Sequence, residues 1–253
     1  MGLKSRNISV NRFMDFIRIM RKSSRFISAL SGIVFALIAS SAAADQIEIG
    51  DGVYVSRKSY RAPANEQPFY GFIKKSPPQL EADKTLTEQI TKKGYSKSYA
   101  FNRAMLNGWR AVGSGKLGLA ARRFNQAYLI DPSQSAIFQA FAVVAHLRFR
   151  DDDYAEELFS TGARMNNRPP GYMADYGRFM LVIGKPREAL PILEEAVRDF
   201  PSNPTVWSNL AFARLKDGQR DRACDAINKS ARLKPPANVA GDLKILVAKA
   251  KCG

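Results

Sequence analysis

Small and large apolar residues recur along the chain at intervals of about 34 positions. Four alanines mark these intervals: Ala120, Ala155, Ala189 and Ala223. Each alanine is followed by a large apolar residue four positions later and by a small one seven positions later; these are Phe124, Phe159, Leu193 and Ile227, and then Ala127, Gly162, Ala196 and Ser230. These offsets fall on one face of an α-helix. The pattern therefore predicts helices whose small residues let a neighbouring helix approach closely.

Prolines follow the helical pattern at a fixed offset. Twelve positions after three of the alanines stand Pro132, Pro201 and Pro235. Because proline cannot continue a helix, each one sets a turn into the next segment. The predicted helices pair over residues 99–113 with 116–130, 134–149 with 152–165, 171–183 with 186–199, and 204–217 with 220–233. One antiparallel pair cannot bury its apolar face alone, so we expect the pairs to stack.

Together these residues resemble the tetratricopeptide-repeat (TPR) family, whose pattern is W-x2-L-G-x2-Y, then A-x3-F, then P. Trp207 and Leu210 match the first part, and Ala120 with Phe124 matches the second. The resemblance covers residues 99–236, with repeats at 99–133, 134–169, 170–203 and 204–236. It implies an all-α solenoid of about four helix pairs with a concave groove, lined by the first helix of each pair.

The second repeat departs from the family pattern. Asn167 stands where the proline is expected, and the interval from Ala120 to Ala155 holds one extra residue. We place the extra residue near Arg150 to Asp153. It predicts a local distortion between the second and third repeats.

A capping helix is predicted after the repeats, within residues 237–253. Over 238–251 its apolar positions are Val239, Leu243, Leu246 and Val247, and its lysines face outward. We expect it to pack on the second helix of the last repeat, which carries Cys224. The chain has two cysteines, Cys224 and Cys252, so only one internal disulfide can form, and it would pin the cap. The alternative is two unpaired thiols.

Residues 45–98 form a different kind of sequence, an N-terminal arm. Two short strands are predicted around Gly50-Asp51-Gly52, followed by a segment with scattered prolines and a helix over 80–93. An isolated hairpin is marginal in water. It must therefore pack on the repeats, pair with a partner or be mobile, and we favour a partly ordered arm.

The pattern of the N-terminal residues indicates an export signal. A basic stretch ends at Arg25, an apolar run covers residues 26–39, and small residues lead to Ala44. These are the three parts of a secretory signal, so residues 1–44 are predicted to be removed by cleavage after Ala44. We expect the mature protein in the bacterial periplasm. An uncleaved membrane anchor over 26–44 is the alternative, and Met1, Met14 and Met20 are alternative starts.

Charge narrows the class of partner. The net charge is +16, and residues 1–44 carry seven of the 39 basic residues and one of the 23 acidic ones. The remaining chain keeps 32 basic and 22 acidic residues, a net charge near +10. This balance favours acidic partners: a protein, an anionic polymer or a lipid surface. The predicted export argues against nucleic acid as a partner. The alternative is a basic surface that serves solubility alone.

Catalytic patterns are sparse in this sequence. The single histidine, His146, falls inside a predicted helix, where packing is the more common role. No Cys/His cluster has the spacing of a metal site, so we predict no metal and no cofactor. Gly113-Ser114-Gly115-Lys116 is a turn between helices, not a phosphate loop that follows a strand. We therefore expect a binding protein rather than an enzyme.

Two surfaces are candidates for binding. The first is the groove implied by the resemblance, with residues Asn102, Met105, Trp109, Val112, Arg178, Thr205, Ser208, Asn209, Phe212 and Lys216. Its mixture of cations and rings suits an acidic, partly apolar protein segment, although Trp109 and Phe212 could equally be core residues. The second is the arm over 53–75, whose rings and cations include Tyr54, Arg57, Lys58, Tyr60, Arg61, Lys74 and Lys75.

These surfaces give two functional hypotheses. The first is an exported scaffold that holds a protein partner within a cell-envelope assembly, secretion or polysaccharide system. The alternative is a basic module that binds an anionic envelope polymer or lipid through the arm. In that second case the rings would face outward rather than dock on the repeats.

Overall fold

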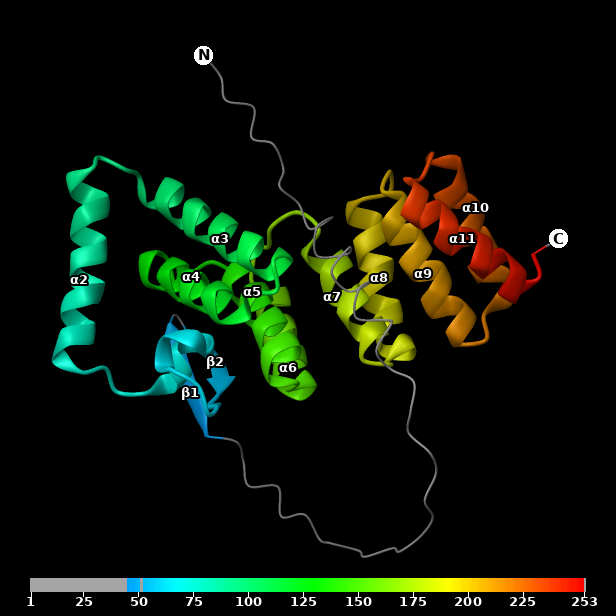
Figure 1. Ribbon diagram of the computed structural model, residues 1–253. Helices are drawn as coiled ribbons and strands as arrows, with labels where there is room; N and C mark the ends of the chain where they lie inside the picture. The colour runs from blue at the N-terminus through cyan, green and yellow to red at the C-terminus, as the bar shows by residue number, and fades with distance from the viewer. Residues whose placement is uncertain (1–44, 51, 253) are drawn as a thin grey trace, which may run out of the picture. The chain divides into compact units, whose positions relative to one another are not determined.

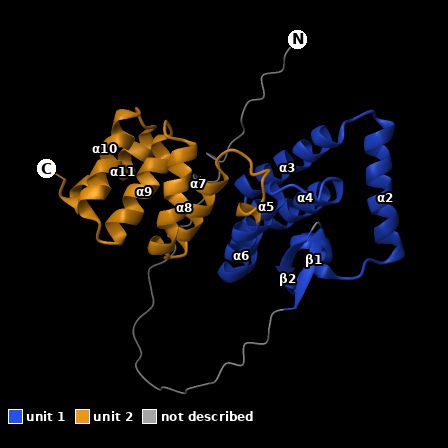
Figure 2. Cartoon of the chain, turned by 180° about the vertical axis from the view of Figure 1, so that it is seen from behind, with its two compact units in different colours: residues 1–161 blue, residues 162–253 orange. Residues whose placement is uncertain are grey.

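The computed structural model describes residues 45–50 and 52–252, and the predicted export signal lies outside them. The chain divides into two compact units, the first ending at Thr161 and the second beginning at Gly162 (Figure 2). Both are built mainly from antiparallel helix pairs (Figure 1). Every helix among the described residues is too short or too polar to cross a lipid bilayer.

The first unit holds the arm and the first two helix pairs. Its arm contains the strands β1 (Gln46–Gly50) and β2 (Val53–Ser56), the short helices η1 (Ala64–Glu66) and η2 (Pro68–Phe72), and the helix α2 (Pro77–Lys92). The pairs are α3 (Lys97–Gly113) with α4 (Leu117–Ile130), and α5 (Ala136–Val144), continued by η3 (Ala145–Phe149), with α6 (Asp152–Ala163). The last two residues of α6 fall beyond the boundary at Thr161.

The second unit holds two further pairs and a final helix. The pairs are α7 (Tyr172–Val182) with α8 (Pro186–Asp199) and α9 (Pro204–Lys216) with α10 (Arg220–Arg232), and the last helix is α11 (Ala237–Ala250). The fold is thus the predicted all-α one with an N-terminal hairpin. Pro186 and Pro204 open their helices at positions where a missing N–H leaves no hydrogen bond unmade.

Two large residues of the repeat pattern pack against glycines of the preceding helix. The four alanines that mark the intervals are fully buried. Phe124 of α4 packs against Gly108 of α3, where a Cβ would lie 2.2 Å from the phenyl ring. Leu193 of α8 packs in the same way on Gly177 of α7, at 2.5 Å. The glycines on the first helices therefore make room for the large residues on the second.

The extra residue of the second repeat lies earlier than predicted. The helix α5 runs into a π-helical turn, η3, and Arg150 then takes a left-handed conformation with φ of 58°. A π-turn adds a residue to a helix without ending it. The distortion therefore lies between the two helices of the second repeat and ends at Arg150, the first residue of the predicted segment, rather than between the second and third repeats as expected.

The arm is packed on the first unit rather than partly ordered, which corrects the expectation from the sequence. The strands β1 and β2 form the predicted antiparallel hairpin, with an irregularity between Glu48 and Gly50. Val55 and Phe69 are buried. The short helices η1 and η2 both lie against α4.

The helix α2 stands apart from the helix pairs of its unit (Figure 1). It begins earlier than predicted because Pro77 and Pro78 fit its first turn, behind the capping residue Ser76. None of its residues is buried, and Leu80 is 55% exposed. Leu80, in its first turn, thus faces solvent.

The last helix caps the second unit. Val239, Leu243 and Leu246 of α11 are buried against α9 and α10, whereas Val247 is 39% exposed, which corrects its predicted place in the core. The predicted disulfide is present: Cys224 of α10 is bonded to Cys252, with their Cα atoms 5.7 Å apart.

Candidate binding surfaces

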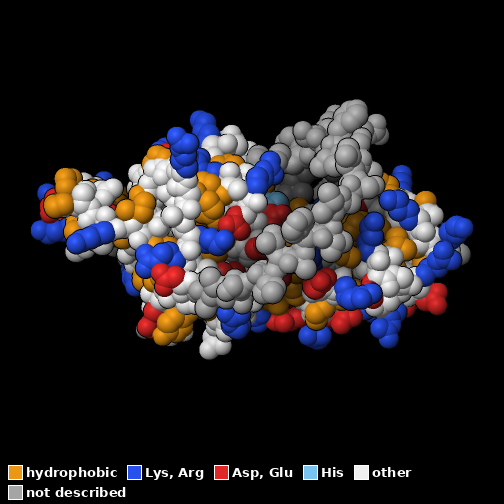
Figure 3. Space-filling model, turned by 90° about the horizontal axis from the view of Figure 1, so that it is seen from below, with side chains coloured by type: hydrophobic (Ala, Val, Ile, Leu, Met, Phe, Trp, Pro, Cys, Tyr) orange, Lys and Arg blue, Asp and Glu red, His pale blue; other side chains and the backbone are white. Residues whose placement is uncertain are grey.

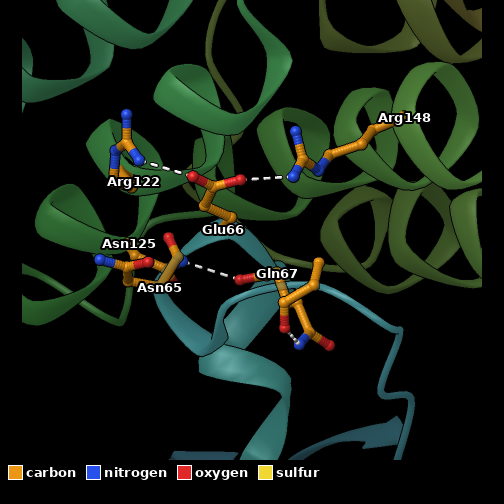
Figure 4. A network of polar contacts seen from close by, with 7 residues as sticks. Asn65, Glu66, Gln67, Arg122, Asn125 and Arg148 are labelled. Carbon is orange, nitrogen blue, oxygen red and sulfur yellow. Dashed lines mark hydrogen bonds and ion pairs between the residues drawn. The ribbon is translucent and has the colours of Figure 1, made fainter.

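Polar contacts hold the arm against the helix pairs of the first unit (Figure 4). The Glu66 carboxylate, in η1, accepts a hydrogen bond from Arg122 of α4 at 2.5 Å and another from Arg148 of η3. Its side chain is only 16% exposed, so these ion pairs are better shielded from water than ordinary surface pairs. Arg148 reaches Glu66 from the π-helical turn, which ties the unusual turn to the arm.

A buried amide fixes the backbone beside this pair. The Asn125 side chain of α4 is fully buried. Its Nδ2 donates to the carbonyl oxygens of Asn65 at 3.0 Å and Gln67 at 2.7 Å, and its Oδ1 accepts from the Tyr70 N–H at 3.2 Å. One side chain therefore satisfies three backbone groups of the arm, of which the carbonyl of Gln67 belongs to a fully buried residue that needs a partner inside the protein.

An aromatic contact anchors the next turn of the arm. The Phe69 ring lies 4.6 Å from the Phe141 ring and 5.2 Å from the Tyr128 ring, measured between centroids. Phe69, Tyr70 and Phe72 all have positive φ angles, between 51° and 56°. Such angles cost an L-residue of this size about 1–2 kcal/mol each. Burial of Phe69 offsets part of that strain.

The start of the arm docks on the second helix pair. The Tyr60 ring stacks on Phe149 at 3.9 Å, and its hydroxyl donates to Asp151 at 3.0 Å. Burial, together with the negative charge of Asp151, raises the pKa of Tyr60. The Ser56 N–H donates to a Glu157 carboxylate oxygen at 2.5 Å. The arm thus contacts both pairs of the unit.

Several of the predicted basic and aromatic arm residues are engaged within the unit. Lys58 pairs with Asp151 at 3.4 Å, Arg57 pairs with Asp45 at 2.7 Å, and Lys75 pairs with Asp83. Arg61 and Lys74 make no ion pair within the residues that the structure describes, and Tyr54 is 49% exposed. The predicted patch is therefore divided between docked and exposed residues.

The groove residues predicted in the first unit are largely packing residues. Met105 and Val112 are buried in α3. Trp109 is half-buried, with its ring 5.1 Å from the Phe124 ring. Asn102 is exposed. Of this set, Asn102 is therefore the residue most accessible to a partner, and Trp109 contributes to both the core and the surface.

The groove residues predicted in the second unit come together on α7 and α9. Arg178 of α7 donates to the Asn209 side-chain oxygen of α9 at 3.2 Å. Farther along α9, the Lys216 ammonium lies 5.7 Å from the centre of the half-buried Phe212 ring. Ser208 and Asn209 are buried, whereas Lys216 is exposed and Thr205 is half-buried. Two first helices of successive repeats thus share a strip of cations, amide and ring.

The contacts of Asn125 and Glu66 were missed by sequence reasoning. Each acts on a segment more than 50 positions away, at separations of 60 for Asn125 with Asn65 and 56 for Arg122 with Glu66. The one available signal is a polar residue, Asn125, directly after the repeat position Phe124. A second missed residue is Arg214 of α9, which pairs with Glu194 of α8 at 3.2 Å.

The helix pairs of both units, with small residues facing large ones, are the geometry of a known repeat. A family model described as tetratricopeptide repeat matches residues 184–241. A solved structure of PilF from Pseudomonas aeruginosa is similar at 25% identity, with a TM-score of 0.55 over 61% of this chain and 71% of that one. Residues 184–241 therefore match the TPR family, and the helix pairs of the chain have a TPR-like fold. Cut9, solved with Hcn1 as a hetero-tetramer of the APC/C, shares the fold at 16% identity and a TM-score of 0.51, over 66% of this chain and 32% of that one.

A comparison with curated proteins gave no match to this chain. On the face shown in Figure 3, Lys and Arg side chains are spread widely, with Asp and Glu side chains among them. The basic excess is thus distributed over that face, and local arrangements such as the strip on α7 and α9 must supply any specificity.

Proposed function

We propose that this TPR protein is an exported scaffold that binds an acidic, partly apolar segment of a partner protein along α7 and α9. The observation that carries the proposal is the contact between Arg178 and Asn209 on successive first helices, with Phe212 and Lys216 next along α9. TPR proteins as a class bind protein segments, which makes binding the expected role of this fold.

The chemistry of the strip favours an acidic ligand. Arg178 is half-buried, so a carboxylate that reaches it would meet a cation screened less than one in open water. Lys216 is exposed and can move to meet a second acid. Phe212 offers an apolar surface between the two cations. A segment with acids on either side of an apolar residue would match all three groups.

We propose that the protein is exported from the cytoplasm. The basic, apolar and small-residue parts of residues 1–44 support it, and the disulfide between Cys224 and Cys252 agrees with an oxidising compartment. We propose the bacterial periplasm, with cleavage after Ala44, and a role in a cell-envelope assembly, secretion or polysaccharide system. N-terminal sequencing of the mature protein tests the cleavage site.

The alternative, an anionic polymer or lipid bound through residues 53–75, draws less support. Tyr60 faces Phe149 and Asp151, and Lys58 and Lys75 have acidic partners in the same unit. A polymer would have to compete with those contacts. Deletion of the arm would also expose Tyr128 and Phe141, which Phe69 contacts, so substitution of Arg61 and Lys74 to Glu is the sharper test of this alternative.

The proposal is tested by affinity capture from envelope extracts with the purified mature protein and its variants. Lys216→Glu is the main variant because its side chain is exposed and its loss should leave the fold intact. Lys244→Glu is the matched control, an exposed lysine on α11 of the same unit. We expect a specific partner that is retained by Lys244→Glu and lost with Lys216→Glu.

Arg178→Gln is a second variant that keeps a polar side chain beside Asn209. Far-UV circular dichroism checks that each variant keeps its helices. Capture of the same proteins by wild type and both groove variants would show that the strip does not select the partner. Capture of nothing above background would contradict the scaffold role itself.

A further inference from the structure

A surface pocket of about 240 Å³ lies on the second unit, between α9 and α10. It is lined by Trp207, Arg214, Asp225, Ala226, Asn228, Lys229 and Arg232. Small-molecule and cofactor sites typically occupy about 300–1,000 Å³, so this pocket has room for one or two amino-acid side chains rather than for a nucleotide.

The charge of the pocket is positive. Three of its lining residues are cationic (Arg214, Lys229 and Arg232), and one, Asp225, is acidic. Arg214 is already paired with Glu194, and it also donates to the Arg222 carbonyl oxygen at 3.2 Å. Lys229 and Arg232 have no acidic partner within the residues that the structure describes. The two free cations would therefore gain a counter-charge from a bound carboxylate.

The aromatic wall of the pocket is held in place. The Trp207 indole N–H donates to the Pro201 carbonyl oxygen at 2.7 Å, and the Lys229 ammonium lies 4.5 Å from the indole centre. The indole also packs against the apolar core under α11. The contact between the Lys229 ammonium and the fixed indole places a positive charge next to an apolar surface. Such a site suits a carboxylate carried on a short methylene stem.

The pocket and the strip on α7 and α9 use different sides of α9. Trp207 and Arg214 are seven residues apart and so share one face of the helix. Asn209 and Phe212 are two and five positions after Trp207, which turns them to the opposite face. The pocket is thus separate from the strip assigned to the partner segment.

We propose that this pocket is a second binding site, for an acidic peptide side chain, with Trp207 as the apolar wall and Lys229 and Arg232 as the charged contacts. The ligand class is a glutamate-containing peptide. Its carboxylate would lie between Lys229 and Arg232, and its methylene groups would pack on the edge of the indole. This site is independent of the proposed function, because Lys216 and Arg178 take no part in it.

Trp207 is a built-in reporter of the site. The chain has two tryptophans, Trp109 in the first unit and Trp207 in the pocket, so Trp109→Phe leaves one indole. The probe is acetyl-tetraglutamate amide, titrated at about 0.15 M ionic strength to screen long-range attraction. We expect a saturable change in Trp207 emission. Acetyl-tetraglutamine amide should give no such change.

The variants locate the effect. Lys229→Glu and Arg232→Glu should each lower the affinity for the glutamate peptide at least tenfold. The matched control is Lys244→Glu, an exposed lysine on α11 that belongs to neither proposed site, and it should leave the titration unchanged. Isothermal titration calorimetry on the wild-type protein with the same peptides gives a second measurement that does not depend on the Trp109→Phe variant.

Four outcomes would overturn the proposal. The glutamine peptide could give the same response, or Lys244→Glu could weaken binding as much as Lys229→Glu. Inorganic phosphate could bind as well as the glutamate peptide, which would show an unspecific anion site. Acetyl-tetraglutamine with a free carboxyl terminus could bind better, which would assign the pocket to a chain terminus. The pocket variants leave Arg178 and Lys216 unchanged, so failure here leaves the proposed function untouched.

Discussion

The side chain of Asn125 donates a hydrogen bond of 2.7 Å to the backbone carbonyl of Gln67, joining the first helix pair to the arm. Both residues are fully buried. The same amide also serves Asn65 and Tyr70, so the docking of the whole turn depends on a single side chain. This relationship makes the arm a structural part of the first unit.

Asn125→Ala should therefore destabilise the protein by about 3 kcal/mol. The change removes three hydrogen bonds, and it leaves the carbonyl oxygen of the buried Gln67 without this partner, at a cost of about 1–3 kcal/mol when no water reaches it. Urea denaturation measures the loss, and limited proteolysis should show faster cleavage within residues 57–75. Asn102→Ala, an exposed amide on α3, is the control and should change the stability by less than about 0.5 kcal/mol. An unchanged arm in Asn125→Ala would mean that the aromatic contacts of Phe69 suffice.

Two glycine-to-alanine changes should have opposite effects. Ala is favoured over Gly inside a helix by about 1 kcal/mol. At Gly108 an added Cβ would lie 2.2 Å from the Phe124 ring, so overpacking should outweigh that gain and give a net loss of about 1–2 kcal/mol. At Gly241 of α11 the added Cβ would meet nothing within 4 Å, so Gly241→Ala should stabilise the protein by the full helix-propensity difference of about 1 kcal/mol. Thermal unfolding of both variants tests the pair, and a stabilising Gly108→Ala would contradict the tight approach of α3 and α4.

Much of the fold could be predicted from the sequence because its signals are local. The spacing of Ala120, Phe124 and Ala127 on one helix, or of Gly184 before Pro186, fixes an element and its neighbour within one repeat. Helix faces follow from such short offsets. The same reasoning placed Val247 in the core, yet it lies toward the outer side of α11, because that helix buries Val239, Leu243, Leu246 and Ala250 instead.

The docking of the arm could not be predicted in this way. The contacts of Glu66 with Arg122 and of Tyr60 with Asp151 join segments 56 and 91 positions apart, and no periodic pattern links them. The candidate strip is an intermediate case. The family resemblance named Arg178 and Asn209, but their hydrogen bond depends on how α7 and α9 pack. Trp207 was matched to the repeat pattern, and its place in a basic pocket became visible only with α10 beside it.

The disulfide should contribute most of its stabilisation to the C-terminal cap. Cys224 and Cys252 are 28 positions apart, and a loop of that size stabilises by about 3–4 kcal/mol in the chain-entropy model. The double variant Cys224→Ser with Cys252→Ser should lose about that amount in urea denaturation. Hydrogen exchange should rise in α11 before it rises in α7 and α8. Equal protection of α11 in the oxidised protein and in the variant would show that the apolar contacts of Leu243 and Leu246 hold the cap alone.

Alkaline pH should weaken the first unit through its buried tyrosines. Burial, with smaller contributions from nearby acidic groups such as Glu157, raises the pKa of Tyr154 above its ordinary value, and burial also raises the pKa of Tyr60, Tyr70 and Tyr128. A tyrosine loses its proton near pH 10 in the unfolded chain, whereas the folded chain keeps it. The stability from these groups is therefore complete below about pH 10 and falls as pH rises further, by about 1.4 kcal/mol per pH unit for each tyrosine.

Tyr154→Phe isolates one of these groups. The Tyr154 side chain is 1% exposed, and its hydroxyl has no hydrogen-bond partner among the described residues, so its removal at pH 8 should leave stability unchanged or raise it by about 1 kcal/mol. Tyr60→Phe is the contrast, because it removes a hydrogen bond to Asp151 and should destabilise at the same pH. Urea denaturation at intervals from pH 8 to about pH 11 should give a shallower decline for Tyr154→Phe than for wild type. A parallel decline in the two proteins would mean that Tyr154 ionises as readily in the folded chain as in the unfolded one.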